Sequence, residues 1–271
     1  MENGIKKVND VYNFLNSIAP VEMSVETDNV GFLVGSGGAG VSKILVSLDI
    51  TGDVISEALD IGAELIVAHH PMFFSLTRVT DECIIGKRII RMLEGGISAI
   101  CMHTNLDAAR GGVNDALAVT VGIADINKDA EPLSDDNRLE TGEVVSLGRV
   151  GHLNKAYTMP EYLVFLKKAL NVNGLRYHDA GRAVHKIAIS SGAGGGEWDN
   201  AVKSGCDTFI TADIKYHMFL DAKELGINII DGGHFSTENL VTKVLAEKLS
   251  TEFPAIEVVI SKALNQTVDF F

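Results

Sequence analysis

Five side chains of the types that bind metals lie in three short clusters of this chain. The clusters are AHHPMFF with His69 and His70, HTNLD with Asp107, and HFSTE with His234 and Glu238. Imidazole and carboxylate together suit zinc, iron, manganese or nickel better than an all-oxygen calcium site. Five ligands exceed what one tetrahedral catalytic ion needs, and they fit two ions that share a bridging carboxylate. The clusters therefore predict a dinuclear divalent-metal centre.

The adjacent histidines constrain the local backbone. Successive strand residues point to opposite faces, so His69 and His70 converge only if the chain leaves β geometry there. Pro71 favours that break because it has no N–H to continue a ladder and it restricts the residue before it. A lone His–His pair beside a proline is more often a packed structural feature than a ligand pair, so the other two clusters carry much of the argument.

Two histidines precede an acid by four residues, His103 before Asp107 and His234 before Glu238. Side chains four residues apart share one face of a helix or tight turn. Each pair can therefore converge.

Each cluster follows an apolar run that predicts a buried strand. In α/β proteins, sites gather at the strand ends. Amphipathic segments alternate with these runs, which favours an α/β architecture. The expected strands are 31–34, 43–50, 65–68, 97–102 and 227–231, and the expected helices are 8–18, 53–62, 85–96 and 113–122.

Composition narrows the class of protein. The 271 residues are 46% apolar and carry a net charge of −13, without the basic footprint of a general nucleic-acid binder. No stretch approaches the length of a membrane span, and the N-terminus lacks a signal-peptide pattern. Cys101 and Cys206 lie in or beside apolar runs and are expected to be reduced core residues. We expect a soluble, cytoplasmic protein.

The second half of the sequence resembles the first. With an offset that places Lys43 on Lys186, Ser47 falls on Ser190 and His70 falls on Asp213. This internal pseudo-repeat predicts two similar α/β lobes that face one another across the metal cleft. The expected organisation is a first lobe at 1–124, an acidic linker at 125–143 with no inserted middle domain, and a second lobe at 144–271.

Two glycine-rich segments are candidates for nucleotide-binding motifs. Gly35-x-Gly37-x-x-Gly40 fits the dinucleotide fingerprint literally, but a strand follows it, so no helix N-terminus faces a phosphate. We interpret it as a hairpin turn. The run from Gly192 to Gly196 precedes a helix-like stretch and is either a strand-to-helix loop or a phosphate contact.

With these residues in view, the chain resembles the Nif-three-like, dinuclear-metal-centre hexameric family, the homologues of GTP cyclohydrolase I type 2. The resemblance covers nearly the whole chain. It implies a toroidal homohexamer with two divalent ions per chain. The family's ligands fall on His69, His70, Asp107, His234 and Glu238. The motifs that carry it are DNVGFLVG, AHHPMFF, HTNLDAARGGVNDAL, LGRVG, ITADIKYH and GGHFSTE.

The resemblance favours a metal-dependent hydrolase that acts on a nucleotide-like substrate, either at a purine ring or at phosphorus. Asp107 or Glu238 would bridge the ions. The alternative is a non-catalytic metal-binding scaffold that handles metal or binds a protein partner. The candidates for contacts with ligands or substrate are His103, Asp213, Lys215, Tyr216 and His217.

Overall fold

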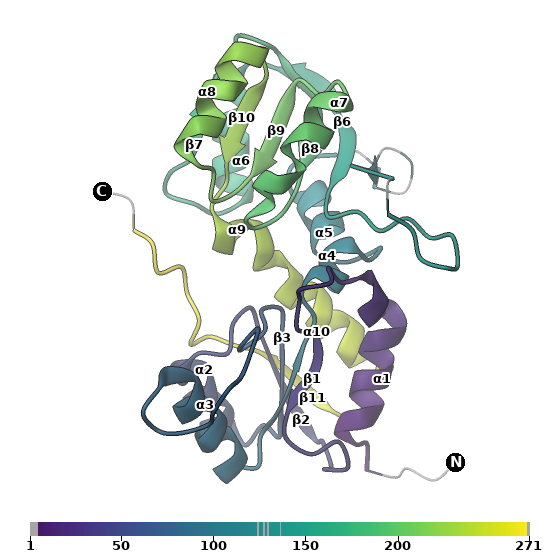
Figure 1. The fold of residues 1–271 in the computed structure, drawn as a ribbon, viewed down its shortest axis with the longest axis vertical. Coiled ribbons are helices and arrows are strands. Elements are labelled where there is room, and N and C mark those ends of the chain that lie inside the picture. Colours follow the sequence, from purple (N-terminus) through teal and green to yellow (C-terminus); the bar gives the residue numbers. More distant parts are fainter. Residues whose placement is uncertain (1–4, 124, 127, 129, 136, 270–271) are drawn as a thin grey trace. The chain divides into compact units, whose positions relative to one another are not determined.

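A computed structural model describes residues 5–123, 125–126, 128, 130–135 and 137–269. The chain has a mixed α/β fold with two sheets, and it divides into two compact units (Figure 1). Unit 1 comprises Met1–Ala109 and Val241–Asn265. Unit 2 comprises Arg110–Leu240 and Gln266–Phe271.

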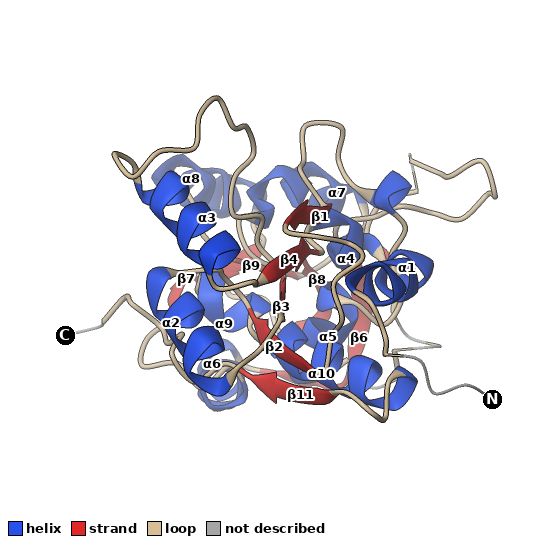
Figure 2. Cartoon of the chain, turned by 90° about the horizontal axis from the view of Figure 1, so that it is seen from below, coloured by secondary structure: helices blue, strands red, loops and turns tan. Residues whose placement is uncertain are grey.

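Unit 1 is built on a five-stranded sheet in the order β1-β4-β3-β2-β11 (Figure 2). Strand β1 is antiparallel to β4, and the other neighbouring strands are parallel. The strands are β1 (Gly31–Val34), β2 (Lys43–Ser47), β3 (Leu65–Ala68), β4 (Ser98–Cys101) and β11 (Glu257–Ile260). The helices are α1 (Val8–Ile18), η1 (Val21–Met23), α2 (Gly52–Ile61), α3 (Ile84–Glu94), α4 (Thr104–Ala108) and, apart from its first residue, α10 (Leu240–Glu252).

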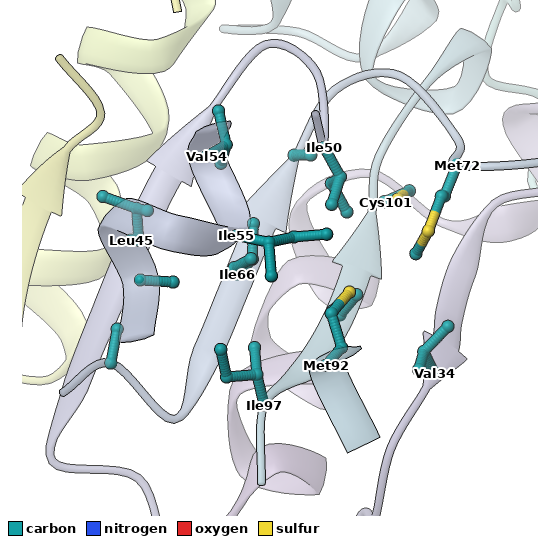
Figure 3. Packing of buried hydrophobic residues seen from close by; sticks show 14 of the residues in the cluster. Val34, Leu45, Ile50, Val54, Ile55, Ile66, Met72, Met92, Ile97 and Cys101 are labelled. Carbon is teal, nitrogen blue, oxygen red and sulfur yellow. The ribbon is translucent and has the colours of Figure 1, made fainter. Parts of the chain in front are cut away.

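Helices α2 and α3 cover one face of this sheet. Ile55 of α2 and Met92 of α3 pack against Leu45 and Ile66 of the strands (Figure 3). Full burial of a side chain such as Ile55 stabilises the fold by about 1.5–3 kcal/mol. Helix α2 begins where the Thr51 side chain accepts a hydrogen bond from the Val54 N–H.

Unit 2 contains a six-stranded sheet in the order β5-β6-β8-β9-β10-β7. Strands β8, β9 and β10 are parallel, and β6 and β7 flank them in antiparallel orientation. The strands are β5 (Glu131–Pro132), β6 (Arg149–Tyr157), β7 (Arg176–His178), β8 (Val184–Ile189), β9 (Thr208–Thr211) and β10 (Asn228–Asp231). The helices are α5 (Val113–Thr120), α6 (Met159–Ala169), η2 (Gly194–Glu197), α7 (Trp198–Lys203), α8 (Tyr216–Leu225) and α9 (His234–Glu238).

Both faces of the parallel strands in unit 2 are covered. Ile210 packs with residues of α5 and α6, while the preceding Phe209 packs with residues of α7 and α8. Strands that are buried on both sides read as continuous apolar runs, which explains the TFIT and NIID patterns.

The same hydrogen bonds between a lysine, an acidic residue and a backbone carbonyl occur at the start of parallel strands in both sheets. In unit 1, Glu64 accepts a hydrogen bond from the Lys43 N–H, and the Lys43 ammonium donates to the Ile61 carbonyl. In unit 2, Asp207 accepts from the Lys186 N–H. The Lys186 ammonium donates to the carbonyl of Ser204. Each contact recurs at the offset seen in the sequence.

The expected helices match α1, α2, α3 and α5 to within two residues at each end. The unit boundaries differ from the expected lobes at 1–124 and 144–271. Strand β11 pairs with β2, so the C-terminal part of the chain returns to unit 1. Strand β5 pairs with β6, so the expected linker at 125–143 contributes to the second sheet. Residues 1–4, 124, 127, 129, 136 and 270–271 of these expected segments lie outside the described residues.

The segment from Gly35 to Gly40 is a turn, but the expectation of a hairpin was wrong. The strands before and after it, β1 and β2, are not neighbours in the sheet. Instead, the carbonyls of Gly37 and Ala39 accept hydrogen bonds from the N–H groups of Asn9 and Val8, each at 3.0 Å. The glycine segment therefore caps the N-terminus of α1 with its own backbone.

No helix in the described part of the chain is both long and apolar enough to cross a membrane.

Candidate metal centre

The histidine pair stands just beyond the end of a buried strand. Strand β3 ends at Ala68, and His69 and His70 follow in a bend. Their backbone N–H groups donate to the carbonyls of Ser47 and Leu48, at 3.3 and 2.9 Å. The two rings come to 5.0 Å between centroids. The prediction that the chain leaves β geometry here is confirmed.

Each of these rings is held through Nδ1. His69 Nδ1 lies 2.7 Å from the Met102 carbonyl, and His70 Nδ1 lies 2.8 Å from Asp49 Oδ1. Since a carbonyl and a carboxylate can only accept, both Nδ1 atoms donate and the lone pairs reside on the Nε2 atoms. Metal-binding histidines are oriented in this way by carbonyls and carboxylates. Asp49 was missed in the sequence, although it follows strand β2 as the histidines follow β3.

Asp107 brings a carboxylate to the same place. Helix α4 carries it, and its Oδ1 lies 3.7 Å from His69 Nε2. The ligand atoms of His69, His70 and His103 all lie within 4.8 Å of one another. Unit 1 therefore gathers a set of imidazole and carboxylate groups that could hold a divalent transition-metal ion.

His103 does not turn its Nδ1 toward Asp107, four residues on. Both carboxylate oxygens of Asp28 lie 2.9 Å from His103 Nδ1, and the Thr104 N–H and hydroxyl also donate to Asp28. Burial alone raises the pKa of the Asp28 carboxyl, but these hydrogen bonds outweigh it and hold the pKa well below its usual range. In the sequence, Asp28 stands out only as the first residue of DNVGFLVG, and no local spacing links it to His103.

Two of the three cysteines are core residues. Cys101 and Cys206 are buried, as expected from the apolar runs. Burial raises the pKa of the Cys101 thiol to about 12 and that of Cys206 to about 11. Both side chains are therefore protonated near neutral pH and behave as small core residues.

Unit 2 holds the other two predicted ligands on one turn of helix. His234 and Glu238 are the first and last residues of α9. His234 Nδ1 lies 2.7 Å from Asp213 Oδ2, and His234 Nε2 lies 3.0 Å from Glu238 Oε2. With Nδ1 donating to Asp213, Nε2 and the carboxylate oxygen both present lone pairs. A proton or a cation between these two atoms would accept both lone pairs. The distance between the two atoms is also typical of two ligand atoms that each lie about 2.0–2.2 Å from one ion.

A glycine is required beside this pair. Gly192 has a φ of +56°, and a Cβ added there would collide with the Glu238 carboxylate and come within 3.3 Å of His234 Cε1. The Gly192 N–H donates to Thr237 Oγ1 at 3.1 Å, and its carbonyl accepts from the Ala212 N–H at 2.9 Å. Gly192 thus lies in the connection after β8 and packs against the predicted ligands, while Gly194 to Gly196 already belong to the short helix η2.

The remaining candidates divide by position. Asp213 contacts His234, and its φ of +52° is unusual for a residue other than glycine. Lys215, Tyr216 and His217 follow at the start of α8 with exposed side chains. Of the candidates in ITADIKYH, the structure therefore links Asp213 to the predicted ligands through a measured contact.

Comparison with known proteins gives a consistent family assignment. A model of the DUF34/NIF3 (NGG1p interacting factor 3) family matches residues 6–266. A Clostridium perfringens protein named GTP cyclohydrolase 1 type 2 homolog is 37% identical over 268 residues, which cover 97% of this chain and 99% of that protein.

Solved structures share the fold. A Bacillus cereus protein related to NIF3 matches with a TM-score of 0.90 at 22% identity, over 99% of this chain and 100% of the other. A Staphylococcus aureus hypothetical protein matches with a TM-score of 0.89 at 26% identity, with the same coverage. The chain, with its imidazole and carboxylate clusters on both units, belongs to the DUF34/NIF3 family.

Proposed function

We propose that this chain binds two divalent metal ions through His69, His70, Asp107, His234 and Glu238. One observation carries the proposal. In each unit a histidine is fixed through Nδ1 to an acceptor and turns Nε2 to a carboxylate oxygen, 3.7 Å away for His69 and Asp107 and 3.0 Å away for His234 and Glu238. Such pairs supply the mixed nitrogen and oxygen ligands of zinc, iron, manganese or nickel.

We further propose that the centre makes the protein a hydrolase of a nucleotide-like compound. A two-metal centre supplies polarisation of the attacked bond and hydroxide at neutral pH. Asp107 or Glu238 would be the carboxylate shared by both ions. Asp49 and Asp213 would hold His70 and His234 in the required tautomer, with Nδ1 protonated. The name of the Clostridium perfringens relative, GTP cyclohydrolase 1 type 2 homolog, supports this substrate class.

The burial of His69 favours a second candidate function. Its side chain is 0% exposed, which restricts the access of water and substrate to an ion held there. A non-catalytic scaffold that stores metal or binds a partner would use the same residues. An open coordination position distinguishes the two functions, because catalytic ions keep one and structural ions do not.

The turnover of nucleotides tests the hydrolase proposal. Protein of defined metal content would be incubated with a panel of nucleoside triphosphates, and the products separated by chromatography. We expect hydrolysis that disappears on chelation and returns with added metal. Fully loaded protein that leaves every nucleotide intact, and whose ions have no exchangeable water, would instead support the scaffold.

We propose a homohexamer, following the family resemblance, and a cytoplasmic location, following the reduced cysteines expected from the sequence. Light scattering should give about six times the chain mass of 29.0 kDa, and the mass of a monomer would contradict the hexamer. We also propose that the two α/β units are an internal pseudo-repeat that meets at the metal cleft. The recurrence of the Lys43 and Glu64 contacts at Lys186 and Asp207 supports the repeat.

A further inference from the structure

Phe74 is an exposed aromatic side chain beside the histidines of unit 1. It is 64% exposed, whereas the preceding Met72 and Phe73 pack against the core of the same unit. The Phe74 ring centroid lies 6.0 Å from that of His103, with the ring planes at 63°. The loop therefore buries two apolar side chains and leaves the third at the rim of the histidine cluster.

Two adjacent residues hold both members of this aromatic pair. Asp28 accepts hydrogen bonds from His103 Nδ1 at 2.9 Å and from the Thr104 N–H at 3.1 Å. Asn29 donates from Nδ2 to the Phe73 carbonyl at 2.7 Å. The side chain of Asp28 is 1% exposed, so this support is shielded from water. The segment DN thereby fixes the His103 ring and the loop that carries Phe74.

The hydrogen bond to Asp28 sets the tautomer of His103. Because a carboxylate only accepts, Nδ1 carries the proton and Nε2 presents a lone pair. The His103 side chain remains 19% exposed. Phe74 thus offers an exposed apolar ring face, and the partly exposed His103 side chain beside it offers a hydrogen-bond acceptor.

We propose that Phe74 and His103 form the subsite that receives the heterocyclic base of the substrate. The base stacks on the Phe74 ring and donates a ring N–H or amino hydrogen to His103 Nε2. Asp28 is a positioning residue, because it acts on the base through His103. This proposal deepens the proposed function and rests on it for the nucleotide-like class of substrate.

The exposure of Phe74 has a competing explanation, which is contact with another protein chain. A protein contact would be insensitive to the presence of a base on a small ligand. Base stacking is strong enough to measure, since loss of one aromatic partner weakens the binding of nucleic-acid ligands by roughly 5- to 150-fold. The two explanations therefore separate in a binding experiment.

The test compares ligands with and without a base on the metal-loaded, full-length protein. Isothermal titration calorimetry would measure the Kd of GTP, ATP and inorganic tripolyphosphate. We expect Phe74→Ala to weaken the affinity for the tighter-binding nucleotide by roughly 5- to 150-fold and to change tripolyphosphate binding less than about twofold. Phe74→Trp should retain the affinity. Leu76→Ala is the matched control, since Leu76 is a 43% exposed apolar residue of the same loop.

Asp28→Asn tests the positioning role by the same comparison. It should weaken nucleotide binding and spare tripolyphosphate, whereas a general loss of structure would weaken both. Three results would overturn the proposal: neither nucleotide binds wild-type protein more tightly than tripolyphosphate, Phe74→Ala weakens all ligands equally, or Phe74→Ala alters only the mass in light scattering. Base-dependent binding without turnover would support the subsite. It would contradict only the proposal that the protein is a hydrolase.

Discussion

Replacing Gly192 with alanine should damage the metal centre through unit 2. The added Cβ would collide with the carboxylate of Glu238 and lie 3.3 Å from His234 Cε1. Both residues are proposed ligands, and Glu238 is 4% exposed, so its carboxylate has little room to retreat. We expect the variant to fold and to hold its metal more weakly.

Two costs of this substitution can be sized from the structure. A φ of +56° costs an alanine about 1–2 kcal/mol of backbone strain, and overpacking typically adds about 1–3 kcal/mol. For a chain of this size each kcal/mol lowers the Tm by roughly 2–4 °C. Disturbing the support of a ligand weakens metal binding by about 10–100-fold.

Gly205→Ala provides the matched control. Gly205 also has a positive φ, +66°, but a Cβ there meets no atom within 4 Å. This variant should show the strain in its Tm and bind metal like wild-type protein. Thermal unfolding and a metal titration against a chelating dye would measure both effects. Equal metal affinity in the two variants would refute the reasoning about Glu238.

Three further predictions follow from the same contacts. His103→Ala should keep more metal affinity than His234→Ala in the dye titration, because His103 is assigned to the base rather than to the ions. Gly37→Val should lower the Tm more than Gly38→Ala, because a Cβ collides with the Asn9 side chain at the first position and meets no atom at the second. Asp28→Asn should flatten the acid limb of the Tm against pH. The pKa of the Asp28 carboxyl is lower in the folded protein than its unfolded value of about 3.9. The carboxylate therefore stabilises the fold at pH values above that unfolded pKa, and this stabilisation is lost as the pH falls toward the folded pKa.

Each of these predictions has a contradicting result. A folded His103→Ala protein that binds no metal would make His103 a ligand. A Gly37→Val protein with the Tm of wild-type protein but a lower affinity for nucleotides would indicate that the segment is a nucleotide-binding site. Parallel acid limbs for wild-type protein and Asp28→Asn would show that the Asp28 carboxylate is not held by its hydrogen bonds.

The strands and the helix that position the ligands could be predicted from the sequence, because the patterns that indicate them are local. The apolar runs before His69 and Asp107 become β3 and β4, and the four-residue spacing of His234 and Glu238 becomes one helical turn. Pro71 indicated the break in the backbone. These inferences need only the geometry of neighbouring residues.

The partners of the histidines could not be found in this way. Asp28 lies 75 residues before His103, and Asp49 lies 21 residues before His70. Only the pairing of strands brings such residues together. The units of the structure differ from the expected lobes for a similar reason, since the pairing of β11 with β2 joins the C-terminal segment to unit 1.

Metal content tests the central claim most directly. Protein purified without chelators would be analysed by inductively coupled plasma mass spectrometry, beside Asp107→Ala and Glu238→Ala. We predict close to two divalent ions per wild-type chain, and loss of both ions when a bridging carboxylate is removed. One ion per undamaged wild-type chain, or a full first ion retained in both variants, would contradict the dinuclear centre.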